Sequence, residues 1–360
     1  MVGLATPPWV DIPAWRLAIA LALTVSGCET PAAWAQEPMS TLARYRSAMS
    51  VYRSEGVDGA KARVRALNAV EVISAVKELQ RETHRADESR VSHWTSELFG
   101  VALVVHLELY VDSARVGSAA AWHLEVASIL LHLHRAATGP TQFRRQAAVA
   151  LAWLLQIAGG FDLLRAHLSD SVKEFPAEPA LLVAQAALYE AAASPRFREP
   201  GAAIAATSLD MAARSYRRAL DLDPAKAEVR ARLGLVLIRL NRLEEARAEL
   251  ELAVAGADSA RSLYLAALFR GRSFELARHL ERAVDSYRQA HAAAPQCQVA
   301  TLALSNALAL LGDRKNAVAV ASRVASVGPD RCDDPWWLYD YGEAWRLEAT
   351  LAALRHDAVQ

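Results

Sequence analysis

A short pattern of small and large residues returns four times between Leu209 and Pro329, and it limits the possible folds of this chain more than any other feature. Each copy has an alanine, then a position four residues later that is large in three of the copies. A small or apolar residue follows three further on. The copies begin at Ala212, Ala246, Ala283 and Ala317, which are 34, 37 and 34 residues apart. This spacing indicates stacked copies of one supersecondary unit.

A second segment precedes each of the last three copies and carries a small residue among larger ones. The small residues are Gly234, Gly271 and Ser305. Small residues at helical spacing let two antiparallel helices approach closely, while the large residue of the copy fills the gap between neighbouring pairs. Proline then begins a new unit, since an interior helical position would not accept it. The sequence therefore predicts pairs of antiparallel helices.

A period near 34, with a small residue in the first helix and alanines in the second, resembles the tetratricopeptide repeat. The resemblance covers Gln142 to about Leu354. It implies an all-α fold, a right-handed α-solenoid of stacked antiparallel helix pairs. We divide the chain into a signal segment at 1–35, an irregular helical region at 36–140, repeats at 141–330 with an insertion near 194–208, and a C-terminal capping helix at 331–360.

The resemblance also implies a function, because tetratricopeptide arrays are protein-binding scaffolds whose first helices line a concave groove. Guanidinium groups in such a groove would pair with acidic side chains or a terminal carboxylate of an extended peptide. Register places six residues of this sequence on the groove face: Arg232, Leu235, Arg239, Phe269, Arg272 and Asn306. No full carboxylate-clamp pattern is identifiable among them.

The charge balance and the motifs argue against other classes of function. Lys+Arg and Asp+Glu number 40 each, so no net field attracts nucleic acid or anionic lipid. The sequence has no phosphate-binding glycine loop, no G-x-S-x-G elbow and no H-E-x-x-H pair. We therefore expect a non-enzymatic protein without a cofactor, with a protein or peptide as its partner.

Residues 1–35 have the features of a secretory signal. Arg16 precedes an apolar run at 17–25 that is too short to span a bilayer. Two processing sites remain open: cleavage after the A-x-A sequence that ends at Ala35, or a lipobox at 25–28 in which Cys28 would be lipidated. Either site predicts export, to the periplasm or to a lipid anchor in the bacterial envelope. No later stretch is long and apolar enough to span a membrane.

Cysteines and histidines give two further candidate sites, one for a disulfide and one for a metal ion. Cys297 and Cys332 stand at nearly equivalent places in consecutive units and could pair in an oxidising compartment. Against this, equivalent points on stacked helices are about 8–10 Å apart, beyond the limit of about 7 Å between bonded cysteines. His123, His132 and His134 share one expected helix but lie too far apart, or point in different directions, to bind one metal ion.

The sequence thus predicts an adaptor of the bacterial envelope that binds a partner in a concave groove. A rival hypothesis is an enzyme in the N-terminal region, which would require convergence of four residues in a polar pocket: His93, His106, Glu108 and His123. A third is self-association through the aromatic C-terminal segment. There Asp334 and Pro335 mark the expected start of the capping helix.

Overall fold

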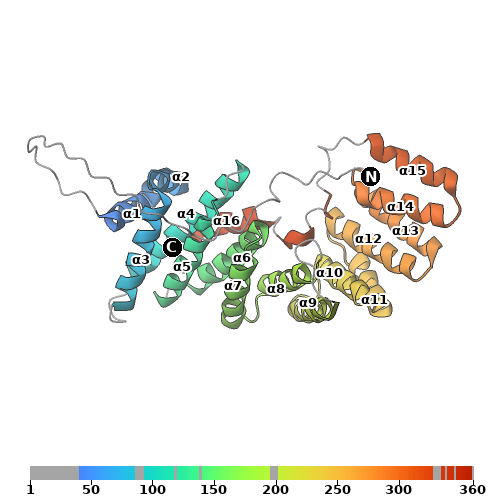
Figure 1. Cartoon of the computed structure of the whole chain (residues 1–360), viewed down its shortest axis with the longest axis horizontal. Helices are drawn as coiled ribbons and strands as arrows, with labels where there is room; N and C mark the ends of the chain where they lie inside the picture. The colour runs from blue at the N-terminus through green and yellow to red at the C-terminus, as the bar shows by residue number, and fades with distance from the viewer. Residues whose placement is uncertain are drawn as a thin grey trace, which may run out of the picture.

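The computed structural model describes residues 40–85, 93–116, 120–137, 140–194, 202–326, 334–336, 339–343 and 346–358. These residues form helices and turns and contain no β-strand. The helices stack side by side into an elongated array (Figure 1). The predicted all-α solenoid of antiparallel helix pairs is confirmed.

Five antiparallel pairs make up the repeat region, and each first helix also approaches the first helix or the second helix of a neighbouring pair. The pairs are α6 (Thr141–Ala158) with α7 (Phe161–Glu174), α8 (Pro179–Ala192) with α9 (Ala202–Leu222), α10 (Ala227–Arg239) with α11 (Leu243–Ala255), α12 (Ala260–Leu276) with α13 (Leu280–Ala293), and α14 (Gln298–Leu310) with α15 (Arg314–Ser326).

The small residues of the first helices lie against the large residues of the second helices. A Cβ atom placed on Gly234 would lie 2.5 Å from Leu250 Cγ, and one on Gly271 would lie 2.5 Å from Tyr287 Cδ1. In the last pair Ser305 takes the equivalent position, and its hydroxyl donates to the carbonyl of Ala317. The pattern found in the sequence is therefore a set of close helix crossings.

The N-terminal helices continue the same stack. They are α1 (Thr41–Ser50), α2 (Tyr52–Arg65), α3 (Ala69–Arg85), α4 (His93–Arg115) and α5 (Trp122–Ala136). Helix α2 contains a kink at Gly56, which has a φ of 69°. Because α4 packs along α5 and α5 packs along α6, these helices join the repeats without a separate domain boundary.

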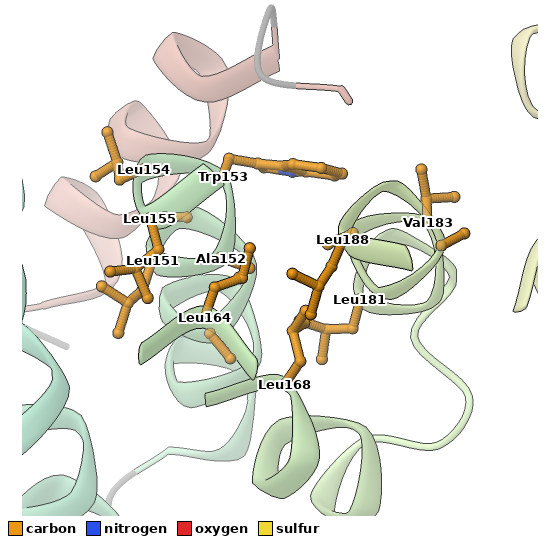
Figure 2. Packing of buried hydrophobic residues seen from close by; sticks show 14 of the residues in the cluster. Leu151, Ala152, Trp153, Leu154, Leu155, Leu164, Leu168, Leu181, Val183 and Leu188 are labelled. Carbon is orange, nitrogen blue, oxygen red and sulfur yellow. The ribbon is translucent and has the colours of Figure 1, made fainter. Parts of the chain in front are cut away.

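Leucines from three consecutive helices form the apolar layer between pairs (Figure 2). Leu155 of α6, Leu168 of α7 and Leu181 of α8 are each at most 1% exposed. Trp153, on the same helix as Leu155, extends toward a different neighbour, the C-terminal segment. One face of α6 therefore packs within the stack, and another face holds the end of the chain.

The C-terminal segment, expected to be a capping helix at 331–360, forms an α-helix only near its end among the residues described. It contains a short 3-10 turn, η3 (Tyr339–Tyr341), and the helix α16 (Leu347–Asp357). Figure 1 shows α16 beside α4 and α6, far from α15. Gly342, with a φ of 63°, lies in the left-handed region that interrupts a helix. The described part of the segment thus runs back from α14, past α6, to α4.

Other expectations about the ends and the insertion fall partly outside the described residues. The signal segment 1–35, which contains Cys28, lies outside the described residues, and so does Cys332. Export, lipidation and the disulfide therefore stay predictions. The sequence predicts an insertion near 194–208. Because α9 begins at Ala202, the second half of this stretch belongs to α9 and lengthens that helix at its start. In the described part of the chain, no helix has the length and apolar character that a membrane crossing requires.

The close crossing at Gly271 gives a test of the stack. Replacing Gly271 by serine should lower the free energy of unfolding by about 1–3 kcal/mol, because the new side chain overlaps the buried Tyr287 ring. In the last pair, the residues that correspond to Gly271 and Tyr287 are Ser305 and Ala321. Gly271→Ser in a Tyr287→Ala protein reproduces that combination, so its cost in unfolding free energy should be smaller by about 0.5 kcal/mol or more. Urea unfolding of the four proteins measures both costs, and equal costs would contradict the proposed contact.

Candidate functional site

The concave face of the repeats is the candidate site, and the residues expected there fall into two groups. Arg232 on α10 and Phe269 on α12 are buried, with exposed fractions of 0% and 2%. The chain's own C-terminal segment covers them. Arg272 remains exposed beside Glu275, and Asn306 donates to that same carboxylate. Leu235 is half-buried, and Arg239 donates to the carbonyl of Ala193.

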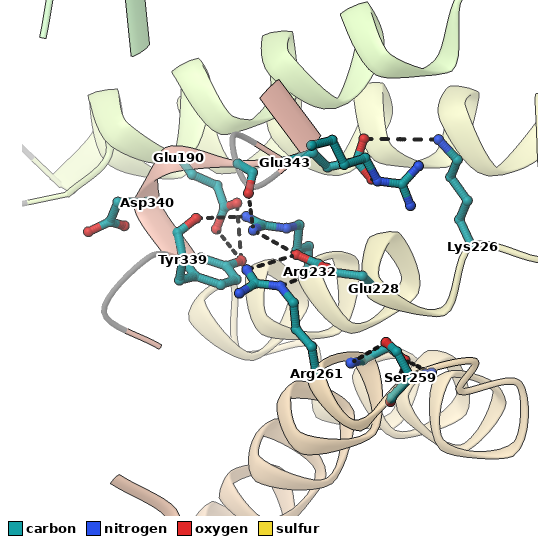
Figure 3. A network of polar contacts seen from close by, with 12 residues as sticks. Glu190, Lys226, Glu228, Arg232, Ser259, Arg261, Tyr339, Asp340 and Glu343 are labelled. Atoms are coloured by element: carbon teal, nitrogen blue, oxygen red, sulfur yellow. Dashed lines mark hydrogen bonds and ion pairs between the residues drawn. The ribbon is translucent and has the colours of Figure 1, made fainter. Parts of the chain in front are cut away.

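Arg232 binds the main chain of the C-terminal segment (Figure 3). Its Nη1 donates to the carbonyl of Tyr339 and its Nη2 to the carbonyl of Gly342, each at 2.9 Å. The same Nη2 lies 3.1 Å from Glu228, and the guanidinium carbon lies 4.3 Å from the centre of the Tyr339 ring. Burial lowers the pKa of this guanidinium, but Glu228, Glu190 and the hydroxyls of Tyr216 and Tyr339 together outweigh burial and raise the pKa overall, so Arg232 stays charged.

A buried carboxylate receives the side chain of the same tyrosine. Glu190 on α8 is 5% exposed, and its two oxygens lie 3.0 and 3.1 Å from the Tyr339 hydroxyl that donates to it. The Tyr216 hydroxyl donates to Glu190 at 2.5 Å, and Arg239 Nη1 lies 3.7 Å away. Burial raises the pKa of Glu190, while the Tyr216 hydrogen bond and Arg232 act in the opposite direction. The site therefore recognises a tyrosine by its ring and by its hydroxyl.

Asp334 anchors the beginning of the segment at the other end of the face. It is 0% exposed, and its carboxylate accepts from the Tyr264 hydroxyl at 2.8 Å and from the amide of Val299 at 3.2 Å. It also accepts from the amide of Trp336, two residues on. This local bond is a turn and not the helix cap that the sequence suggested. Phe269 meets the rings of Trp336 and Tyr339 edge to face.

Glycine is required at the place where the segment crosses α6. A Cβ atom on Gly342 would lie 2.2 Å from Cζ3 of Trp153, which is inside any permitted contact. One turn along the same helix, Gln156 Nε2 donates to the carbonyl of Asp340 at 2.9 Å. Both the positive φ of Gly342 and the indole ring exclude a side chain here.

Further along, α16 binds the N-terminal helices. Arg355 Nη1 lies 2.8 Å from Glu108 Oε1 on α4, and the Tyr52 hydroxyl of α2 donates to the carbonyl of Arg355. Lys61 Nζ lies 3.9 Å from the other oxygen of Glu108. The segment therefore connects the middle of the solenoid with its N-terminal end, and Glu108 serves this connection.

The residues of the rival enzyme hypothesis do not meet in an open pocket. Nδ1 of His106 and Nδ1 of His123 are 2.8 Å apart, and His106 Nε2 lies 3.1 Å from the Tyr45 hydroxyl. Their exposed fractions are 0% and 6%. Burial lowers the pKa of His123 to about 4 and that of His106 well below its usual value, so both imidazoles are neutral. The side chain of His93 lies outside the described residues, and Glu108 contacts Arg355 instead.

The three histidines of the possible metal site lie on α5 but differ in burial. His123 and His134 are buried in α5, whereas His132 on the same helix is exposed. Within the residues that the structure describes, no group of three or more histidine, cysteine or acidic side chains is arranged to hold a metal ion. Cys297 is 1% exposed at the start of α14.

Several residues of the site were not singled out from the sequence. They are Trp153, Gln156, Glu190, Tyr216, Tyr339 and Gly342. The helices that carry them show only the apolar periodicity of a core. That periodicity is the same whether a helix packs against a neighbouring helix or against a segment from the end of the chain. The density of aromatic residues at 336–345 was the one available signal, since exposed aromatic side chains favour interfaces.

Comparison with known proteins identifies one repeat by sequence. Residues 227–255, which comprise α10 and α11, match the family model described as tetratricopeptide repeat. No curated protein matches the chain. Among solved structures, a fragment of MamA from Desulfovibrio magneticus RS-1 is 17% identical, with a TM-score of 0.42 over 53% of this chain and 97% of that chain.

Two further solved structures give similar values. PilW, described as a widely conserved type IV pilus biogenesis factor, is 21% identical with a TM-score of 0.43 over 60% of this chain and 91% of that chain. PilF of Pseudomonas aeruginosa is 16% identical with a TM-score of 0.44 over 58% and 88%. The repeat assignment itself rests on the match at 227–255 and on the helix crossings described above.

The buried histidines predict a loss of stability in mild acid. Burial lowers the pKa of His134 from 6.5 to about 4, so the unfolded chain binds more protons than the folded chain between these values. The stability is therefore fully present above pH 6.5 and falls as the pH approaches 4. His134→Gln should reduce the drop in unfolding free energy between pH 7 and pH 5 by about 1–2 kcal/mol.

The matched control for this measurement is His132→Gln, two residues away on α5 with an exposed side chain. It should leave the drop at its wild-type size. Urea unfolding at pH 7, 6 and 5 compares the three proteins. A His134→Gln protein that loses stability as steeply as the wild type would show that this histidine does not titrate on unfolding.

Proposed function

We propose, from the premise that residues 227–255 are a tetratricopeptide repeat, that the chain is a non-enzymatic scaffold whose concave face binds an extended segment of a protein partner. The observation that carries this proposal is the position of Arg232. A buried guanidinium that donates to two main-chain carbonyls is chemistry for holding a peptide backbone.

The rest of the face supports the same interpretation. Gln156 supplies another main-chain contact, and Glu190 together with Phe269 forms a pocket for a tyrosine side chain. Main-chain hydrogen bonds give affinity for any extended segment, and side-chain pockets give selectivity. A face with both kinds of group suits the recognition of one peptide among many.

An enzyme in the N-terminal helices is the less favoured candidate. A general base must come within hydrogen-bond reach of the proton it removes. His106 is 0% exposed, and its two ring nitrogens already face His123 and Tyr45. The arrangement supports a role in packing α1, α4 and α5 together.

The envelope location remains part of the proposal and rests on the signal-like segment at 1–35. An exported scaffold of this kind would act as an adaptor between proteins of the periplasm or the membrane surface. Lipidation of Cys28 would tether it to the membrane, whereas cleavage after Ala35 would release it into the periplasm.

Site-specific photo-crosslinking tests the scaffold function in the native cells. A crosslinking amino acid would replace Arg272, on the first helix α12, or Leu252, on the second helix α11. These residues have similar exposure, with 52% for the Arg272 side chain and 54% for Leu252. We expect a reproducible partner from position 272 in several-fold excess over position 252, because partners bind the face of the first helices.

Mass spectrometry of the crosslinked products identifies the partner and, from the N-terminal peptide of the chain, its processing site. The same products in equal amounts from both positions would show nonspecific contact. Products from position 252 alone would place partner binding on the opposite face and reject the concave site.

A further inference from the structure

We propose that residues 334–336 and 339–343 occupy the site of a partner's segment, and that the concave face recognises a peptide that carries Tyr-x-x-Gly, adopts the same turn and displaces this segment. The inference rests on the proposed scaffold function and adds to it the chemistry of the partner. It also makes the chain's own end a competitor for its own binding site.

The contacts between the face and its present occupant are of a kind that another peptide can reproduce. Arg232 and Gln156 donate to the carbonyls of Tyr339, Asp340 and Gly342, and every peptide has such carbonyls. The carbonyls carry no information about sequence. An incoming segment would therefore replace these bonds one for one, and the exchange would leave no donor of the face unpaired.

Selectivity comes from two positions of the occupant. At the first, a ring must fit between Arg232 and Phe269, and a hydroxyl must reach the buried Glu190. Phenylalanine would leave one hydrogen bond of that carboxylate unmade, which should lower the affinity about 5- to 150-fold. At the second, three residues later, Trp153 leaves no room for a Cβ atom. Tyrosine and glycine at this spacing are thus the minimal requirement.

The polar groups of the face also explain why it needs an occupant. Arg232 is 0% exposed and Glu190 is 5% exposed with the segment in place. Charged groups held in such an environment are costly unless they are paired and hydrogen-bonded. Departure of the segment removes partners from both groups, so the favoured release is an exchange in which a partner's segment takes over the same bonds.

The test uses the full chain and a labelled synthetic peptide with the sequence of residues 333–346. In the Gly342→Val chain, the new side chain would collide with Trp153 and keep the chain's own segment off the face. Gly312→Val is the matched control, because Gly312 also has a positive φ, of 92°, but nothing lies within 4 Å of its Cβ position. A second peptide has the same sequence but with valine in place of Gly342. Fluorescence anisotropy measures binding.

We expect the native peptide to bind the Gly342→Val chain about tenfold or more tightly than the wild type, because a tethered competitor acts at about millimolar effective concentration. The Gly312→Val chain should match the wild type. The peptide with valine should bind none of the three chains. Adding Glu190→Gln to the Gly342→Val chain should weaken its binding of the native peptide. A peptide with Tyr339→Phe should bind the Gly342→Val chain more weakly than the native peptide does.

Equal binding of the native peptide to the wild-type and Gly342→Val chains, or equal binding of the two peptides, would overturn the proposal. If circular dichroism shows that Gly342→Val has lost helicity, Tyr339→Ala releases the segment by another route, and the same comparison decides. A wild-type dimer that the peptide converts to monomers would assign the segment to a second copy of the chain and would also overturn it.

The outcome separates this inference from the scaffold function itself. Partners crosslinked at position 272, together with failure of the peptide to bind a released face, would keep the scaffold and reject the Tyr-x-x-Gly segment. Peptide binding without any crosslinked partner would support the recognition chemistry and leave the scaffold role rejected.

Discussion

A buried arginine that binds two backbone carbonyls is the interaction on which the concave face depends. Arg232 holds Tyr339 and Gly342 at a point where the solenoid would otherwise present a charge to an open groove. The paired Glu228 carboxylate, together with Glu190 and the two tyrosine hydroxyls beside it, raises the pKa of the guanidinium despite its burial and keeps it charged. Because one charged donor fixes both carbonyls, the rest of the segment, from Asp334 to α16, is positioned relative to it.

This segment changes how the solenoid is stabilised. In a repeat array each unit contacts its neighbours, and stability is nearly a sum of local terms. Here Asp334 contacts α12 and α14, whereas Arg355 at the far end of the segment contacts α4. The segment thereby links units that are distant in the stack. Release of the segment would restore the independence of the units, so occupancy of the face and rigidity of the array are coupled.

The core that surrounds this face combines two kinds of burial. Between pairs, glycine and large side chains such as those of Gly271 and Tyr287 interlock, and the contact is apolar. In the N-terminal helices, His106, His123 and Tyr45 form a buried polar cluster whose neutral imidazoles satisfy one another. The first kind is indifferent to pH, and the second makes the N-terminal part of the stack sensitive to acid.

Much of the fold could be predicted from the sequence, because its cause is local. The alanines and small residues at 34- to 37-residue spacing specify helix pairs that approach closely, and each pair lies within a short stretch of chain. The same register placed Arg232 and Phe269 on the groove face, and in the structure both residues contact the chain's own C-terminal segment.

The occupant of the groove could not be found in this way. Leu338, Tyr341 and Trp345 have helical spacing in the sequence, but the segment that contains them turns at Gly342 instead of continuing as a helix. The contacts of this segment join residues far apart along the chain. Arg232 and Tyr339 differ by 107 in residue number, and Glu190 and Tyr339 differ by 149. Periodicity reports only neighbours within a few turns.

The sequence by itself determined the helices and their pairing, since both follow from side-chain size at helical spacing. Only the tertiary structure decided that the chain's own end lies on the concave face. The curvature of the stacked pairs brings Trp153, Glu190 and Arg232 from three different helices to one surface, and that convergence selects a tyrosine and a glycine.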